Sequence, residues 1–358
     1  PYGGNLAFGF APSSASNPAL GWETTTSLNF GIDFGFWENR IYGSFDIYRN
    51  RTTDLLLDVP LPAITGLINP TTLNSGELEN RGWEFELSSV NVRTPNLKWS
   101  TNFNLTHNEN EVLKLGFGLS NIVGLQRNIS TNITLPGYPI ASYYFYETDG
   151  LLTDVSTEPI APNQAVGQPK IVDQNGDGEI TADDRKIMDD NSPGYIWGLR
   201  NSIEYKNFDF SFLINGVHDL QTYFFLGRYI DKADNRRNQT TNWANGYRGE
   251  NSPGNGDAYY PFGAPLPTFT DRWLYAGDYI RVKNITLGYT LPPSALAKVG
   301  VTKLRIFSTA DNLFNFTDYP GGNPETNNYN SGDPLSQGSD YGTYPLSRTF
   351  VFGVNVSF

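Results

Sequence analysis

A segment of twelve residues, Asp173 to Asp184, carries oxygen-bearing side chains at the spacing of a calcium-binding loop. Such a loop takes its ligands from positions 1, 3, 5, 7, 9 and 12 and needs glycine at position 6 for a sharp turn. Gly178 fills the sixth position. The candidate ligands are Asp173, Asn175, Asp177, Glu179 through its backbone carbonyl, Thr181 and Asp184. We expect a structural Ca²⁺ that stiffens the loop and has no catalytic role.

The same segment allows a second interpretation. The run Asn-Gly-Asp-Gly can form a turn rich in Asx hydrogen bonds without any ion. The last ligand is also an aspartate, Asp184, in place of the longer glutamate of an EF-hand, so closure around a cation is weaker. The sequence leaves the occupied loop and the ion-free turn as alternatives.

A second concentration of candidate residues lies in the long segment 219–278, where aromatic rings stand among Asn, Gly and Arg. Aromatic faces stack on sugar rings or pack against a partner protein, which makes these rings candidates for contact with a ligand or partner. The alternative is that they pack the loop onto itself. The candidates are Tyr223, Phe224, Phe225, Trp243, Tyr247, Tyr259, Tyr260 and Trp273.

Nothing in the sequence indicates catalysis. The chain has no cysteine, and its two histidines, His107 and His218, belong to no Ser-His-Asp set or zinc spacing. Lys and Arg total 25 against 37 Asp and Glu, and the net charge of −12 argues against a nucleic-acid partner. Five acids share one phase of the predicted strands and are expected to serve structure: Asp33, Asp46, Glu84, Glu86 and Asp209. We therefore predict no enzyme and no organic cofactor.

The elements that position these residues are β-strands, because alternating patterns recur along the chain and helical periodicity is nearly absent. The C-terminal segment is the clearest case, with large apolar residues on one face and small or polar residues on the other. Its apolar face consists of Phe350, Phe352, Val354, Val356 and Phe358. Eleven strands are predicted, at residues 22–36, 40–52, 81–92, 97–110, 120–134, 139–149, 195–206, 207–218, 278–291, 302–316 and 346–358.

Strand length and connections favour an all-β, transmembrane, up-and-down antiparallel β-barrel. Membrane strands need about 9–11 residues, whereas strands of a soluble β-sandwich or β-propeller average about 5–6. Short connections such as 93–96 alternate with long ones such as 151–194 and 219–278. Barrels of the bacterial outer membrane have short periplasmic turns and long extracellular loops, so both long segments are expected outside the cell.

An odd number of strands cannot close an up-and-down barrel, and open edges are not tolerated in lipid. Eleven strands amount to about half of a 22-stranded barrel. The chain also opens at Pro1 without an initiator Met or a signal peptide. We therefore expect residues 1–358 to be the C-terminal part of a longer barrel protein.

Several segments, in order along the chain, resemble the SusC-like family of TonB-dependent outer-membrane transporters from Bacteroidetes-type bacteria, the RagA/SusC type. The match is to the C-terminal half of the family's barrel, and the plug domain, the TonB box and the first strands have no counterpart. The matching segments are 17–26, 80–84, 137–140, 146–150, 205–209, 278–292, 311–318 and 344–350.

The resemblance implies TonB-dependent import of glycan or peptide nutrients across the bacterial outer membrane. It implies a SusD-like lipoprotein as a lid over the extracellular mouth, TonB acting through the missing N-terminal part, and contact with lipid and lipopolysaccharide. The cargo would be an oligosaccharide or a peptide. Two alternatives are a structural barrel component of a larger outer-membrane surface complex and a soluble calcium-dependent glycan-binding β-protein.

Overall fold

The dominant element is an antiparallel sheet of nine strands, each paired with its neighbour in the order in which the chain forms them. The computed structural model describes residues 16–59, 63–66, 71–116, 118–126, 129–156, 158–162, 164–231, 238–252, 254, 270–297, 300–326 and 333–358. The strands are β1 (Thr24–Phe36), β2 (Ile41–Thr53), β5 (Glu77–Arg93), β6 (Leu97–Lys114), β13 (Tyr195–Tyr205), β14 (Phe208–His218), β17 (Tyr279–Thr290), β18 (Lys303–Phe316) and β19 (Thr349–Ser357). This topology confirms the predicted up-and-down antiparallel arrangement.

One face of the sheet is apolar and exposed. Phe210 pairs with Leu287 and Phe212 with Ile285, so alternation places large apolar residues side by side on this face. Phe30, Leu287 and Phe352 are 64 %, 51 % and 80 % exposed, so these rows do not meet one another in a dry interior. A soluble sandwich would bury such rows between two sheets, and this sheet instead presents them outward as a membrane barrel does.

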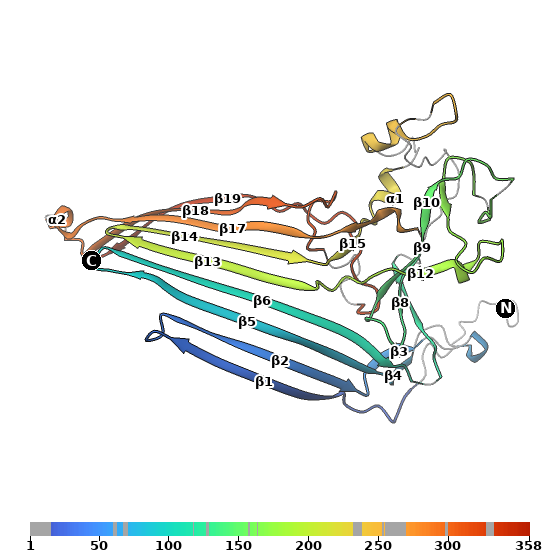
Figure 1. Ribbon diagram of the computed structural model, residues 1–358, viewed down its shortest axis with the longest axis horizontal. Helices are drawn as coiled ribbons and strands as arrows, with labels where there is room; N and C mark the ends of the chain where they lie inside the picture. The colour runs from blue at the N-terminus through green and yellow to red at the C-terminus, as the bar shows by residue number, and fades with distance from the viewer. Residues whose placement is uncertain are drawn as a thin grey trace, which may run out of the picture.

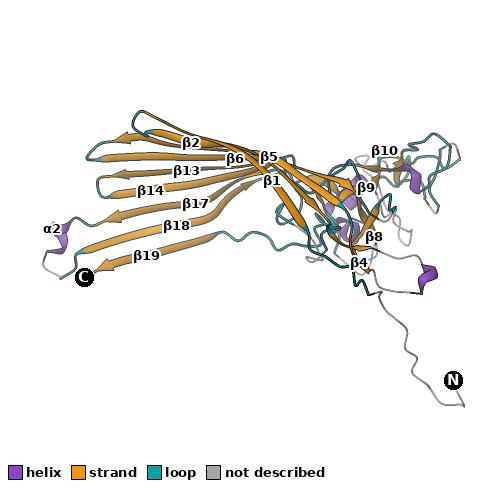
Figure 2. Cartoon of the chain, turned by 90° about the horizontal axis from the view of Figure 1, so that it is seen from below, coloured by secondary structure: helices purple, strands orange, loops and turns teal. Residues whose placement is uncertain are grey.

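The connections separate cleanly by length. Short turns join β1 to β2, β5 to β6 and β13 to β14, and the helix α2 (Pro293–Leu296) lies between β17 and β18. All of these, with the C-terminus, lie at one end of the sheet (Figures 1 and 2). The four long connections, residues 54–76, 115–194, 219–278 and 317–348, emerge at the opposite end. By the barrel rule, the turn end is periplasmic and the loop end extracellular.

The prediction of eleven wall strands is wrong by two. The predicted strands 120–134 and 139–149 lie among the extracellular loops, in a four-stranded sheet of their own, ordered β12-β9-β8-β7. The described residues therefore contribute nine wall strands, fewer than half of a 22-stranded barrel, and residues 115–194 form a single long connection. The periplasmic and extracellular ends are still assigned as predicted, because removing two consecutive strands does not change the direction in which the other strands run.

The loop end holds the remaining short elements. No helix among the described residues is long and apolar enough to cross a membrane. The small strands are β3 (Leu56–Val59), β4 (Thr71–Asn74), β7 (Ile122–Gln126), β8 (Ile129–Thr134), β9 (Ser142–Tyr146), β10 (Thr148–Leu151), β11 (Pro169–Ile171), β12 (Arg185–Ile187), β15 (Gln221–Tyr223) and β16 (Leu274–Ala276). The helices are α1 (Gly227–Ile230) and the 3₁₀ turns η1 (Ala63–Thr65), η2 (Ala182–Asp184), η3 (Thr241–Asn245) and η4 (Asp271–Trp273).

Candidate functional site

Three of the four extracellular loops share one aromatic core. Buried rings from the 115–194, 219–278 and 317–348 loops pack together, and the fully buried Trp273 lies among them. Phe145 and Tyr223, from different loops, have ring centroids 4.5 Å apart. Because aromatic side chains bury large areas, this cluster contributes most of the apolar packing outside the sheet. The buried members are Tyr143, Phe145, Tyr223, Phe224, Phe225, Trp273 and Tyr319.

Hydrogen bonds lock the same three loops together at the backbone. The amide of Tyr223 donates to the carbonyl of Gly338 at 2.9 Å, and the amide of Asp340 donates to the carbonyl of Tyr223 at 2.8 Å. The hydroxyl of Tyr143 donates to the same Gly338 carbonyl at 2.8 Å. The hydroxyl of Tyr319 donates to the buried Asp340 carboxylate at 2.8 Å. Because buried polar groups must be paired, these bonds fix the relative positions of the loops.

An ion pair ties the last loop to the barrel wall. Arg281 of β17 is 3 % exposed, and its Nη1 lies 2.7 Å from Oε2 of Glu325 in the 317–348 loop. The hydroxyl of Tyr279 donates to the other carboxylate oxygen of Glu325. Burial alone would raise the pKa of Glu325, but the hydrogen bonds from Tyr279 and Arg281 outweigh it and hold that pKa below its usual value. Glu325 therefore stays ionised and holds the loop at neutral pH.

The aromatic contact candidates are placed mostly inside this assembly. Tyr223, Phe224, Phe225 and Trp273 are at most 8 % exposed, so their rings pack the loop core and do not face a ligand in this arrangement. This is the packing alternative that the sequence left open. Tyr247 is half-buried, and the backbone of Trp243 lies in η3. Tyr259 and Tyr260 lie outside the described residues.

The calcium-type loop folds as a tight turn held by its own acids. Asp173 accepts hydrogen bonds from the amides of Gly176 and Gly178 at 2.7 and 2.8 Å. These bonds, that of Gly178 first, lower the pKa of Asp173. Asp184 is fully buried and accepts from the amides of Gln174 and Thr181 at 2.9 and 2.7 Å. Gly176 and Gly178 both have positive φ, 75° and 84°, which glycine adopts without strain.

This geometry fits a cation only in part. Each carboxylate oxygen has two lone pairs, so one that accepts an amide N–H can still contact a metal. Asp177 is engaged in the same way, because one of its carboxylate oxygens accepts from the amide of Glu179 and the other from the side-chain amide of Asn175. Within the described ranges, no three His, Cys, Asp or Glu side chains come together in an arrangement that could hold a metal ion. The loop as described is the hydrogen-bonded turn, and the ion stays a prediction.

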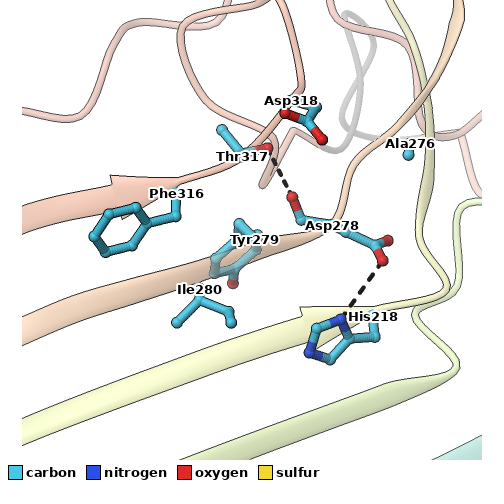
Figure 3. Close-up of a pocket in the computed structure, with 8 residues that line it drawn as sticks. All are labelled: His218, Ala276, Asp278, Tyr279, Ile280, Phe316, Thr317 and Asp318. Carbon is cyan, nitrogen blue, oxygen red and sulfur yellow. Dashed lines mark hydrogen bonds and ion pairs between the residues drawn. The ribbon is translucent and has the colours of Figure 1, made fainter.

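A hollow of about 360 Å³ lies where β14, β17 and β18 meet the loops (Figure 3). His218 Nδ1 lies 3.6 Å from an Asp278 carboxylate oxygen, and both side chains are partly exposed. Two hydroxyls line this hollow, and both are engaged: that of Thr317 donates to the Asp278 carbonyl at 2.7 Å, and that of Tyr279 donates to the Glu325 carboxylate. An imidazole–carboxylate pair without an available nucleophile is not a hydrolytic triad. The contacts of Asp278 with His218 and Thr317 instead stabilise the junction between the barrel wall and the loops.

The opposite face of the sheet is polar. Asp46 pairs with Glu84 across β2 and β5, on the side away from Phe45 and Trp83. Asp209 forms an ion pair with Arg305, whose Nε lies 2.9 Å from the carboxylate. Arg305 of β18 reaches this carboxylate of β14 across the intervening strand β17, and opposite charges placed in this way stabilise the lumen side of the wall. Among these predicted lumen acids, Asp209 therefore has an ion-pair partner, whereas Asp46 and Glu84 are like charges directly opposite each other.

Two components of the loop assembly differ from what the sequence predicts. Tyr143 and Phe145 fall in the predicted wall strand 139–149, although the unbroken aromatic run Tyr143 to Tyr146 is typical of a strand covered on both faces rather than of an alternating one. That run was the available signal. The pairing of Arg281 with Glu325 joins residues 44 positions apart and had no local signal.

The chain is similar to proteins of one kind. Residues 1–150 match the family described as "TonB dependent receptor-like, beta-barrel". TonB-dependent receptor P3 of Formosa agariphila is 35 % identical over 357 residues, which cover 96 % of this chain and 35 % of that protein. TonB-dependent receptor SusC of Bacteroides thetaiotaomicron is 30 % identical over 369 residues, 99 % of this chain and 34 % of that protein.

The chain belongs to the SusC/RagA-like TonB-dependent receptor β-barrels. Its fold matches the structure of the RagAB peptide transporter with a TM-score of 0.80 at 24 % identity, covering 98 % of this chain and 37 % of that one. The chain thus spans about a third of the length of the curated relatives it matches.

Membership of the TonB-dependent receptors decides two of the predictions. The nine-stranded sheet is part of an outer-membrane β-barrel, and its exposed apolar face is the surface that meets lipid. The family consists of transport proteins rather than enzymes, which confirms that the chain is not an enzyme. The soluble glycan-binding alternative is excluded.

Proposed function

We propose that the receptor containing this chain imports oligosaccharide or peptide nutrients across the outer membrane, driven by TonB and covered by a SusD-like lipoprotein. One observation carries the proposal. All four long loops emerge at the same end of a lipid-facing sheet, and three of them share a single buried core. A rigid extracellular rim of this kind offers a preformed surface to a lid protein and to cargo.

The comparisons support the same assignment. A relative at 30 % identity is named SusC, and the matching fold is that of a peptide transporter called RagAB. TonB would act through a part of the receptor outside this chain, since the nine strands contribute only to the wall. Both classes of cargo stay within the proposal because a polar lumen with Asp209, Arg305 and Glu84 can bind hydroxyl groups or charged peptide groups.

The test uses the full-length receptor in its native host. Uptake of fluorescent oligosaccharides and of fluorescent mixed peptides is measured in wild-type cells, in cells without the receptor and in cells without TonB. We expect one cargo class to enter only when both are present, and a lipoprotein to co-purify with the receptor. Uptake that is unchanged without the receptor would instead favour the structural component of a surface complex.

We also propose that residues 173–184 bind Ca²⁺ as a stiffener of the extracellular 115–194 loop. The filled ligand spacing and the positive φ of Gly176 and Gly178 support this. The donor Arg185 anchors the end of the motif, with its Nη2 donating to the carbonyls of Ser130 and Tyr144 at 2.8 and 2.9 Å. A cation there would act on loop order, with an affinity on the order of 10⁻⁴–10⁻³ M as in extracellular modules.

A further inference from the structure

A hollow of about 350 Å³ opens at the turn end of the sheet, away from the loops and the lumen. Its lining includes Trp37, Arg40, Ile41, Ser89, Asn91 and Trp99. Ile41 pairs with Phe36 and with Ser89, in the same phase as the apolar rows, so the hollow lies on the lipid-facing side. The ring of Trp37 lies 6.3 Å from that of Phe36, on the same side.

The strand β5 is irregular at this point. Its register with β6 shifts between Val90 and Val92, which leaves Asn91 as the extra residue of a β-bulge. Bulges re-aim side chains and cluster next to sites of function. Here the side-chain Nδ2 of Asn91 donates to the Thr101 hydroxyl at 2.7 Å, and its side-chain Oδ1 accepts from the Ser89 hydroxyl at 2.8 Å.

This series of hydrogen bonds between polar side chains continues across the apolar face of the sheet. The Thr101 hydroxyl and the Trp99 indole N–H both donate to Oδ1 of Asn201, at 2.7 and 2.8 Å. Asn201 is only 8 % exposed and shares its face with Phe212. Polar side chains on a lipid-facing surface are costly and are generally functional. Trp37 and Trp99 lie beside them, and tryptophan is enriched at the level of the lipid head groups.

Arg40 is the charged residue of the lining. Its Nη2 donates to the carbonyls of Val90 and Asn91 at 3.4 and 3.2 Å, which fixes the guanidinium over the bulge. The guanidinium is exposed, and its other nitrogens form no hydrogen bond to the described residues. A planar guanidinium with unused donors matches the oxygens of a phosphate group.

We propose that this hollow binds a phospholipid of the inner leaflet of the outer membrane. Arg40 receives the phosphate, Asn91 and Ser89 meet the polar part of the head group, and the acyl chains lie along the apolar rows of β1 and β2. The inner leaflet follows from the position of the hollow at the periplasmic turns. The positive charge and small volume suit one head group, whereas a protein partner would need a far larger surface.

The first test is lipid retention by the intact receptor, purified in detergent and examined by native mass spectrometry. Three probes are compared: phosphatidylglycerol, diacylglycerol with the same acyl chains, and inorganic phosphate. We expect the wild type to retain phosphatidylglycerol and not diacylglycerol, and Arg40→Gln to lower retention by about tenfold because the phosphate loses its charged donor. Arg93→Gln is the matched control, since Arg93 is exposed at the same end of β5 and does not line the hollow.

A second measurement covers the case in which Arg40→Gln does not fold. In wild-type receptor, phospholipid with brominated acyl chains should quench tryptophan fluorescence, and Trp37→Phe and Trp99→Phe should each remove part of that quenching. Equal retention by wild type and a folded Arg40→Gln would overturn the proposal, as would equal retention of diacylglycerol. Displacement of the lipid by an equal concentration of inorganic phosphate would also overturn it, because the site would then belong to the free anion.

Discussion

Arg281 and Glu325 join the barrel wall to the last extracellular loop through an ion pair of 2.7 Å, and the arginine is almost completely buried. Breaking such a pair from one side leaves a buried charge without its partner, which costs more than the pair itself contributes. The Glu325 side chain is 42 % exposed, so solvent screening reduces the cost. The pair is therefore a sensitive point for testing whether the loop is fixed to the wall.

Replacing Glu325 by Gln should loosen the 317–348 loop. We expect its docking to weaken by about 1–2 kcal/mol, because Arg281 keeps a hydrogen-bonding partner but loses the negative charge. The measurement is hydrogen exchange of the loop amides, with Tyr319 and Asp340 as reporters. Glu250→Gln, at an exposed glutamate of another loop, is the control. Unchanged exchange in Glu325→Gln would show that the aromatic core alone holds the loop.

The same contact predicts a pH dependence. The pKa of Glu325 is lower in the folded protein than in the unfolded chain, so its contribution is complete above the ordinary glutamate pKa. That contribution is lost as the pH falls from about 5 through the lowered value. Amide exchange of the loop, corrected for intrinsic rates, should accelerate in wild type over this interval. Glu325→Gln should show no such step, and a step of equal size there would assign it to another group.

Trp273→Ala tests the shared aromatic core. The side chain is fully buried and its indole N–H lies 3.3 Å from a carboxylate oxygen of Asp231, so truncation leaves a large cavity. We expect a loss of about 3–5 kcal/mol in loop stability. The amide of Phe224, which donates to the Trp273 carbonyl at 2.7 Å, should lose its exchange protection.

The control for this change is Trp22→Ala, because Trp22 is 92 % exposed. Its effect on loop stability should stay within about 0.5 kcal/mol. The barrel strands should keep their protection in both variants, since the core lies outside the sheet. Loss of protection in β14 and β17 of Trp273→Ala would show that loops and wall unfold as one unit.

Calcium should protect the 115–194 loop from proteolysis. We expect cleavage near residues 173–184 to slow when millimolar Ca²⁺ replaces a chelator, because the ion would bring Asp173, Asp177 and Asp184 to a common centre. Asp173→Asn with Asp177→Asn should abolish the difference. Asp183→Asn is the matched control, since Asp183 is exposed and occupies no ligand position. Equal cleavage with and without Ca²⁺ in wild type would leave the segment as an ion-free turn.

The wall could be predicted from sequence because lipid and lumen impose opposite chemistry on alternate residues. The strands β19 (Thr349–Ser357) and β14, around Phe210, show this rule without interference. The sequence places segments 120–134 and 139–149 in the wall because a small sheet among the loops also contains extended strands, and extension alone does not reveal what covers them. Contacts such as Tyr143 with Gly338 join residues 195 positions apart and leave no mark in local patterns.

The candidate site was less accessible to sequence reasoning. The calcium spacing is visible because its residues are contiguous, and the turn it predicts is present. The aromatic residues of segment 219–278 were visible by type, but type does not distinguish Phe225, which is buried, from a ring that faces cargo. The hollow beside Arg40 depends on a single register shift between β5 and β6 at Asn91, and no sequence pattern predicts that shift.

The common core of the three loops restricts how such receptors can diversify. A ring changed in one loop must be accommodated by the other two, so exchanging a single loop between relatives should produce poorly assembled hybrids. Transplanting all three together should preserve their fit. New cargo preferences would then arise when all three loops are inherited together, or through substitutions confined to exposed residues on the outer surface of the loops.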